Sequence, residues 1–180
     1  MHVQFDELKT TQAAAVLLTR ARGRMSYMAL IKLLYMADRE ALAKWGMPIT
    51  GARYFSLKHG PVLSEVLSLI QDPRPGDAWG THIRKDGYEA ELVMSPGEDH
   101  LCDADVALLN RMFDDYGHFN RWRIRDITHE MPEWTDPGNG RKPIEIEEIL
   151  AAFGFDRNET EQTVRDLGYH AWIRARLEAL

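Results

Sequence analysis

The sequence predicts an α+β fold that is predominantly helical, with a central apolar helix, surrounding helices and a β-hairpin. Three observations support this fold class. One apolar segment, residues 27–45, has the length of a helix rather than of a strand. An Asp-Gly turn at 86–87 lies between two short β-like segments, which is typical of a hairpin. After residue 102, apolar residues recur mainly at helical spacing.

The central helix is predicted from Ser26 to Gly46. Between Tyr27 and Ala37 its only charged residue is Lys32, so the segment is apolar on every face and must be covered on more than one side. Gly46 and then Pro48 follow in the order expected at a helix end. Asp38 lies on an apolar face, where a carboxylate is costly unless it is paired. Three interpretations stay open: a position at the helix edge, a catalytic carboxylate, or a buried pair with Lys58, His59 or Arg53.

Three motifs follow one another in this region: Lys32-Leu33-Leu34-Tyr35-Met36-Ala37-Asp38, Pro48-Ile49-Thr50-Gly51-Ala52-Arg53-Tyr54 and Lys58-His59-Gly60-Pro61-Val62. In this order and spacing they resemble the Panacea domain, which is also called the SocA-like antitoxin domain. The resemblance covers about the first three-quarters of the chain, with looser matches at Trp79, His129 and Trp134.

The resemblance implies an antitoxin that neutralises a co-encoded toxin by direct protein binding. Some members of this family act as proteolytic adaptors, which hand the toxin to an AAA+ protease of the ClpXP type. The expected partners are therefore a toxin protein and such a protease, and no enzyme activity or cofactor is expected. The positions carried over, either as structural or as partner-binding residues, are Lys32, Leu33, Tyr35, Asp38, Gly51, Lys58, His59, Gly60 and Pro61.

The composition excludes several other classes of protein. The net charge of -6 argues against a nucleic-acid partner, whose binding site would be basic. The single cysteine is typical of a reducing compartment, and no signal peptide or membrane span is recognisable, so we expect a cytoplasmic protein. No histidine or cysteine spacing matches a metal site, and no phosphate loop is present. We therefore expect no metal and no membrane partner.

Elements before the hairpin are predicted in order. Asp6 caps a helix that ends at Gly23, and residues 49–57 are extended. Gly60-Pro61 opens a short helix to Ile70. Lys58 and His59 would then form an anion site at its N-terminus, unless they satisfy Asp38 instead. In the hairpin, strands 79–85 and 88–94 place Arg84 opposite Glu89 and His82 opposite Glu91.

The later elements are predicted to be helical. One helix is capped by Asp103, a second starts at Asn120, and residues 132–140 form a linker. A short helix from Pro143 to Phe153 precedes a last helix with a capping box of Asn158 and Glu161. We expect a Panacea-like core domain over residues 1–135 and a C-terminal helical extension over residues 136–180 that packs on the core.

Two sets of residues are candidate partner contacts. Arg121 and Arg125 share a helix face beside Trp122, which indicates either an acidic partner or a solvated helix. Tyr169, Trp172 and Ile173 fall outside the apolar stripe of the last helix, so they are candidate aromatic anchors for the toxin. The alternative is that the last helices wrap the core and bury both faces.

A winged-helix DNA-binding regulator is the alternative function, because a helix precedes the hairpin. Residues 61–70, however, contain Glu65 and no lysine or arginine. A hydrolase that uses His59 and Asp38 would lack an identifiable nucleophile.

Overall fold

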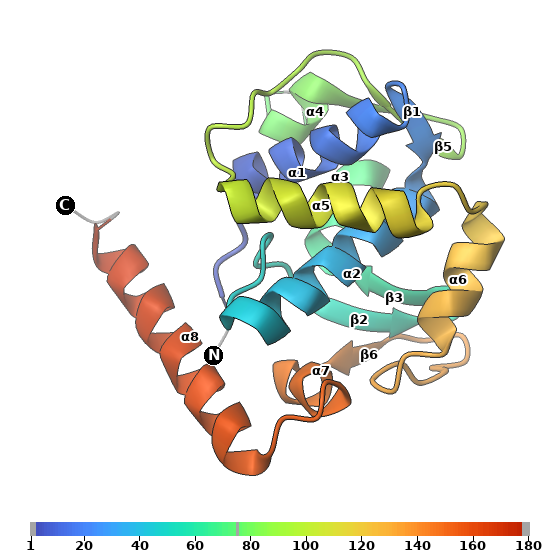
Figure 1. Cartoon of the computed structure of the whole chain (residues 1–180). Coiled ribbons are helices and arrows are strands. Elements are labelled where there is room, and N and C mark those ends of the chain that lie inside the picture. The colour runs from blue at the N-terminus through green and yellow to red at the C-terminus, as the bar shows by residue number, and fades with distance from the viewer. Residues whose placement is uncertain (1–2, 75, 178–180) are drawn as a thin grey trace.

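The computed structural model describes residues 3–74 and 76–177. Within them, eight helices surround two three-stranded antiparallel sheets, so the predicted α+β, predominantly helical fold is confirmed (Figure 1). None of the described helices combines the length and apolarity needed to cross a membrane.

The centre of the fold is helix α2 (Tyr27–Trp45). Every residue from Ala29 to Asp38 is buried, because α1 (Glu7–Arg20) and α5 (Asp103–Tyr116) pack on it and strands of both sheets contact it. The helix ends at Gly46, which has a left-handed φ of 69° that few other residues adopt. The prediction of a central helix covered on several sides is confirmed.

Helix α1 also begins and ends close to its predicted positions. The side chain of Asp6 accepts a hydrogen bond from the backbone N–H of Lys9, at 2.9 Å. Ala13, Ala14 and Ala15 are buried, which lets α1 approach its neighbours closely. In α5, Cys102 rather than Asp103 occupies the N-cap position. In α6 (Arg121–His129), Asn120 caps the helix as predicted.

The first sheet has the strand order β1 (Arg24–Ser26), β5 (Glu89–Leu92) and β4 (Ile83–Asp86). Residues 78–82 form the short helix α4 (Ala78–His82), so the prediction of a strand from Trp79 is wrong. The predicted register is wrong too. Gly87 and Tyr88 form the turn, which places Arg84 opposite Glu91 and leaves His82 outside the sheet. A turn one residue further along the chain moves every cross-strand pair by two positions.

The second sheet has the strand order β3 (Gly60–Leu63), β2 (Tyr54–Leu57) and β6 (Lys142–Ile144). The sequence predicted that helices begin at Gly60 and at Pro143, and both predictions are wrong. Helices α3 (Ser64–Gln71) and α7 (Ile146–Ala152) begin later. Both prolines lie in edge strands, where a missing N–H removes no hydrogen bond needed by the sheet centre. Proline is compatible with an edge strand and with the first turn of a helix, so the sequence did not distinguish between the two.

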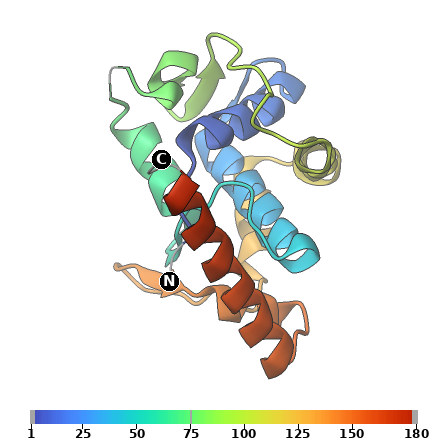
Figure 2. The ribbon, with the colours of Figure 1, turned by 90° about the vertical axis from the view of Figure 1, so that its left-hand side faces the viewer.

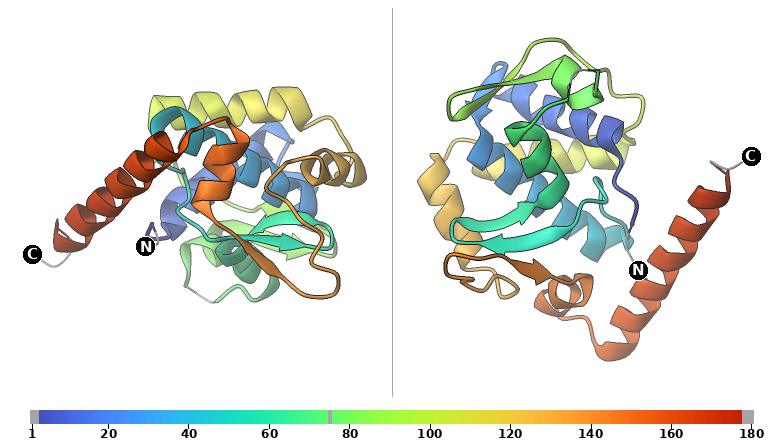
Figure 3. Two further views of the ribbon diagram at one scale, coloured as in Figure 1. Left: turned by 90° about the horizontal axis from the view of Figure 1, so that it is seen from below. Right: turned by 180° about the vertical axis from the view of Figure 1, so that it is seen from behind.

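Helix α8 (Arg157–Leu177) lies along one side of the molecule (Figures 1 and 2). Its capping box uses Asp156 and Glu159, not Asn158 and Glu161. Seen from below and from behind, α8 extends away from the body formed by the other elements (Figure 3). By contrast, β6 pairs with β2, and Ile149 and Leu150 of α7 are buried. The division of the chain at residue 135 stays a prediction, and the structure adds that residues 142–152 belong to the packed body.

Candidate functional site

Three of the family-motif residues, Lys32, Tyr35 and Asp38, form a buried polar stripe on α2, and each of them holds a loop. Asp38 is fully buried, as one interpretation of the sequence required, but its predicted partners are wrong. Its carboxylate accepts hydrogen bonds from the N–H groups of Ile49 and Thr50, both at 2.9 Å, from the Thr50 hydroxyl and from the Tyr54 hydroxyl. Burial raises the pKa of Asp38 to about 6, and the hydrogen bonds from Thr50, Ile49 and Tyr54 act in the opposite direction. Asp38 therefore fixes the loop between α2 and β2.

Arg53, Lys58 and His59 lie elsewhere. Arg53 pairs with Glu65 at 2.6 Å, while Lys58 and His59 are exposed in the turn between β2 and β3. Since no helix begins at Gly60, the predicted helix N-terminal anion site at this motif is wrong. Within the described residues no charged group pairs with Asp38, and two backbone amides and two hydroxyl groups satisfy it instead.

Glu133 is a buried carboxylate that the sequence did not single out. It accepts a hydrogen bond from the Tyr35 hydroxyl at 2.9 Å, and it pairs with the guanidinium of Arg39. Burial and the charge of Glu133 raise the pKa of Tyr35. Glu133 lies in a segment that the sequence predicts to be a linker. The one indication of its burial is its position between a proline, Pro132, and an aromatic residue, Trp134.

Lys32 is the third buried polar residue of the stripe, with 1% of its surface exposed. Its ammonium donates to the carbonyl oxygen of Pro61 at 2.6 Å. Gly60 has a φ of 95°, and a Cβ there would lie 2.8 Å from both Lys32 Nζ and Thr128 Oγ1. The motif positions Lys32, Gly60 and Pro61 thus belong together, because the lysine passes beneath a turn that only glycine fits.

The remaining motif residues also support the fold. Leu33 is fully buried. Gly51 has a φ of 69°, and a Cβ there would lie 2.4 Å from the carbonyl oxygen of Gln4. Leu33 and Gly51 thus make contacts inside the domain, whereas Lys58 and His59 are exposed.

Replacing Lys32 by methionine is expected to change how stability depends on pH. Burial lowers the pKa of Lys32 from 10.5 to about 7, so above pH 7 the unfolded chain binds a proton that the folded chain does not. Stability should then rise by on the order of 2 kcal/mol from about pH 7 to about pH 9. Urea denaturation at both pH values should show this rise in the parent protein and not in Lys32→Met. The exposed-site variant Lys58→Met should keep the rise, and a Lys32→Met variant that keeps it would contradict the assignment.

One exposed face, here called the α6 surface, consists of His59, Tyr88, Arg121, Trp122 and Arg125. The guanidinium of Arg121 lies 4.9 Å from the ring centres of both Tyr88 and Trp122, and that of Arg125 lies 5.1 Å from Trp122. His59 contacts the edge of Trp122, which is 45% exposed. The predicted pair Arg121 and Arg125 therefore converges on one indole ring.

A second exposed face, the α8 face, consists of Arg165, Tyr169, Trp172 and Arg176. Their spacing of four, three and four residues places them on one side of the helix. Tyr169 and Trp172 are 61% and 53% exposed, and their rings stack with centres 6.1 Å apart. The guanidinium of Arg176 lies 4.8 Å from the centre of the Trp172 ring. Ile173, the third predicted anchor, is half-buried.

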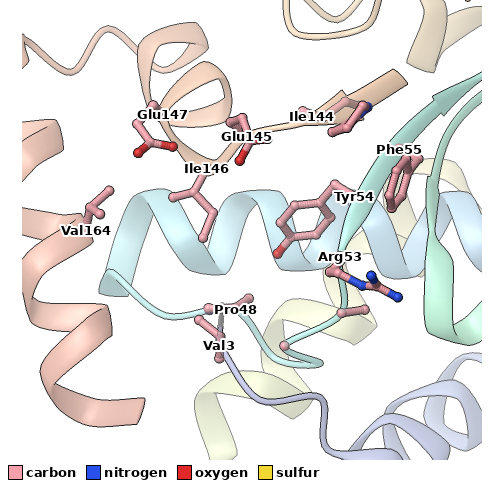
Figure 4. A pocket seen from close by; sticks show the side chains of 13 residues that line it. Val3, Pro48, Arg53, Tyr54, Phe55, Ile144, Glu145, Ile146, Glu147 and Val164 are labelled. Atoms are coloured by element: carbon pink, nitrogen blue, oxygen red, sulfur yellow. The ribbon is translucent and has the colours of Figure 1, made fainter. Parts of the chain in front are cut away.

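Helix α8 is attached to the body by few contacts. Among its described residues only Leu167 is buried, and an ion pair joins Arg174 to Asp6 at 2.8 Å. Between α8 and the body lies a cavity of about 240 Å³, across which Val164 faces Val3, Pro48 and Ile146 (Figure 4). A helix of 21 residues with so little buried surface has little tertiary packing of its own.

Within residues 3–74 and 76–177, no group of three or more histidine, cysteine, aspartate or glutamate side chains is arranged to hold a metal ion. The thiol of Cys102 is free and exposed.

A family model described as "Antitoxin SocA-like, Panacea domain" matches residues 30–135, which is more than half of the chain. The matched segment contains nearly all of α2, the motif residues and the α6 surface, and it ends before β6, α7 and α8. Comparison with curated proteins and with solved structures gives no match.

Proposed function

Because the chain belongs to the SocA-like antitoxin family, whose Panacea domain it contains, we propose that it neutralises a toxin protein by binding it directly. The observation that carries this proposal is the family match across the central helix and its motifs. The proposed activity is binding alone, without catalysis by the antitoxin. Helix α3 contains no lysine or arginine, so nothing in it favours the DNA-binding alternative.

We assign the toxin contact to the α8 face. Tyrosine, tryptophan and arginine are the side chains that most often dominate the energy of a protein interface, and Tyr169, Trp172 and Arg176 form one continuous stripe. The helix is long, exposed and weakly packed, as expected of a helix that inserts into a groove on its partner. Helix α8 also lies outside the matched domain. The same core could therefore be combined with a different helix that is specific for a different partner.

An adaptor must hold its cargo and its protease at the same time, which requires two separate surfaces. Helices α6 and α8, which carry most of these two surfaces, lie on opposite sides of the molecule (Figures 1 and 3). We propose that the α6 surface contacts the AAA+ protease when the antitoxin delivers the toxin to a ClpXP-type enzyme. Three basic groups surround Trp122 there, and although Arg125 is paired with Asp126, Arg121 and His59 still match an acidic segment of the protease.

The test uses the toxin encoded by the neighbouring gene. Trp172→Ala is expected to weaken toxin binding by roughly 30-fold or more, because it removes a central aromatic anchor. Binding is measured by calorimetry and neutralisation by growth during co-expression. Trp122→Ala is the matched control, since it removes a tryptophan of similar exposure, 45% against 53%, from the other surface.

The control variant should bind the toxin like the parent protein and should slow degradation of the toxin by reconstituted ClpXP. If Trp122→Ala loses the toxin while Trp172→Ala retains it, the α8 face is not the toxin site. If the neighbouring gene product neither binds the parent protein nor is neutralised by it, the antitoxin proposal itself fails.

A further inference from the structure

A cavity of about 360 Å³ lies beside the motif residues, between the N-terminal half of α2, the β2–β3 hairpin, α3 and the loop before β6. Its walls are mostly apolar and are formed by Tyr27, Met28, Ile31, Leu57, Val62 and Leu67. This volume falls within the range of roughly 300–1,000 Å³ that is typical of small-molecule sites. The toxin-binding proposal makes no use of this cavity.

The charged groups of the cavity are all basic. Lys32, Lys58 and His59 line it, and no aspartate or glutamate is among its lining residues. The chain as a whole contains 28 acidic residues and 22 lysines and arginines, so this region differs from the average surface. Lys58 and His59 are exposed at the mouth, while the ammonium of Lys32 is buried in the wall.

The buried ammonium has little compensation. Among the described residues, its one hydrogen-bond acceptor is the Pro61 carbonyl oxygen, and no carboxylate offsets the effect of burial on its pKa. On the far side of Gly60, His129 of helix α6 feels the positive charges of Lys32 and Arg125, and the acidic residue that acts on it, Asp126, is paired with Arg125. Positive charge in an apolar, partly enclosed space attracts an anion more strongly than the same charge in water.

We infer that this cavity binds a small amphipathic anion, with an apolar body against α2 and α3 and one carboxylate or phosphate head group at Lys58 and His59. The apolar walls match the body, and the exposed basic side chains of Lys58 and His59 match the head. Gln71 and Asn139 at the rim supply further polar contacts. This inference goes beyond the proposed function and does not depend on it, although His59 belongs both to the cavity and to the α6 surface.

The experiment titrates the full chain, without toxin, with three probes that share one apolar body: sodium octanoate, octyl phosphate and 1-octanol. Affinities come from calorimetry, and the site comes from backbone amide NMR shifts. At least one anionic probe should bind roughly 10-fold or more tightly than octanol, because its head group gains charge-assisted hydrogen bonds. The stronger of the two anions identifies the head group as carboxylate or phosphate.

Variants then test the location. The exposed double variant Lys58→Ala/His59→Ala should lose the preference for the anion and stay folded, whereas Lys142→Ala, an exposed lysine outside the cavity, should keep it. Equal affinity for octanol and both anions would overturn the anion selectivity. Shifts centred away from the cavity, or a double variant that keeps the full preference, would overturn the site. Toxin capture is measured separately, so either proposal can fail alone.

Discussion

The Asp38→Ala variant is expected to lose about 3 kcal/mol of unfolding free energy. The substitution removes the acceptor for two backbone amides and two hydroxyl groups, contributed by Ile49, Thr50 and Tyr54. These donors are buried, and each one left without a partner costs roughly 1–3 kcal/mol. Burial of the carboxylate is itself unfavourable, so its removal offsets part of this cost. The sum of the separate penalties is therefore an upper bound on the loss of unfolding free energy.

Urea denaturation followed by tryptophan fluorescence measures the change. Asp38→Asn keeps a neutral acceptor of the same size, and it should lose only about 1 kcal/mol. The matched surface control, Asp115→Ala, removes an exposed carboxylate and should stay within about 0.5 kcal/mol of the parent protein. An unchanged midpoint for Asp38→Ala would show that the loop between α2 and β2 is held by other contacts.

The Glu133→Ala variant is expected to be destabilised by a similar amount, about 3 kcal/mol. The side chain of Glu133 is fully buried, and that of Arg39 is 16% exposed. Loss of the carboxylate therefore leaves a guanidinium with limited access to water and a buried Tyr35 hydroxyl without its acceptor. The guanidinium of Arg39 also lies 4.3 Å from the ring centre of Phe153, so the change should loosen the end of α7 as well.

Thermal and urea unfolding measure this effect. Glu161→Ala is the matched control, because it breaks an exposed ion pair with Arg157 that should contribute only about 0.3–0.5 kcal/mol. The double variant Arg39→Met/Glu133→Met should recover the part of the loss that comes from the unpaired guanidinium, since a buried ion pair is often replaceable by apolar side chains, while the Tyr35 hydroxyl still lacks its acceptor. If Glu133→Ala matches Glu161→Ala, the buried pair adds nothing to stability.

The elements that the sequence predicted well are those whose signals are local. The central helix follows from an apolar segment with one charge and a glycine end, and α1 follows from an aspartate cap. The family match over residues 30–135 confirms the resemblance carried by the three motifs. Each of these signals is contained within a short stretch of chain.

The parts that the sequence predicted poorly depend on distant partners. Tyr35 and Glu133 are 98 residues apart, and no local pattern connects them. Strands β3 and β6 read as helix starts because proline suits both positions, and only pairing with β2 decides between them. The buried position of Asp38 was among the open alternatives, but its backbone donors could not be identified from residue types.

Strand β6 has a consequence for synthesis of the chain. Ribosomes add roughly 5–20 residues per second, so β2 and β3 emerge several seconds before residues 142–144. During that interval one edge of β2 has no partner strand, and open edges of this kind favour pairing with other chains. A nascent or prematurely ended chain that lacks β6 is thus the form most exposed to aggregation, although it already contains the whole family-matched domain.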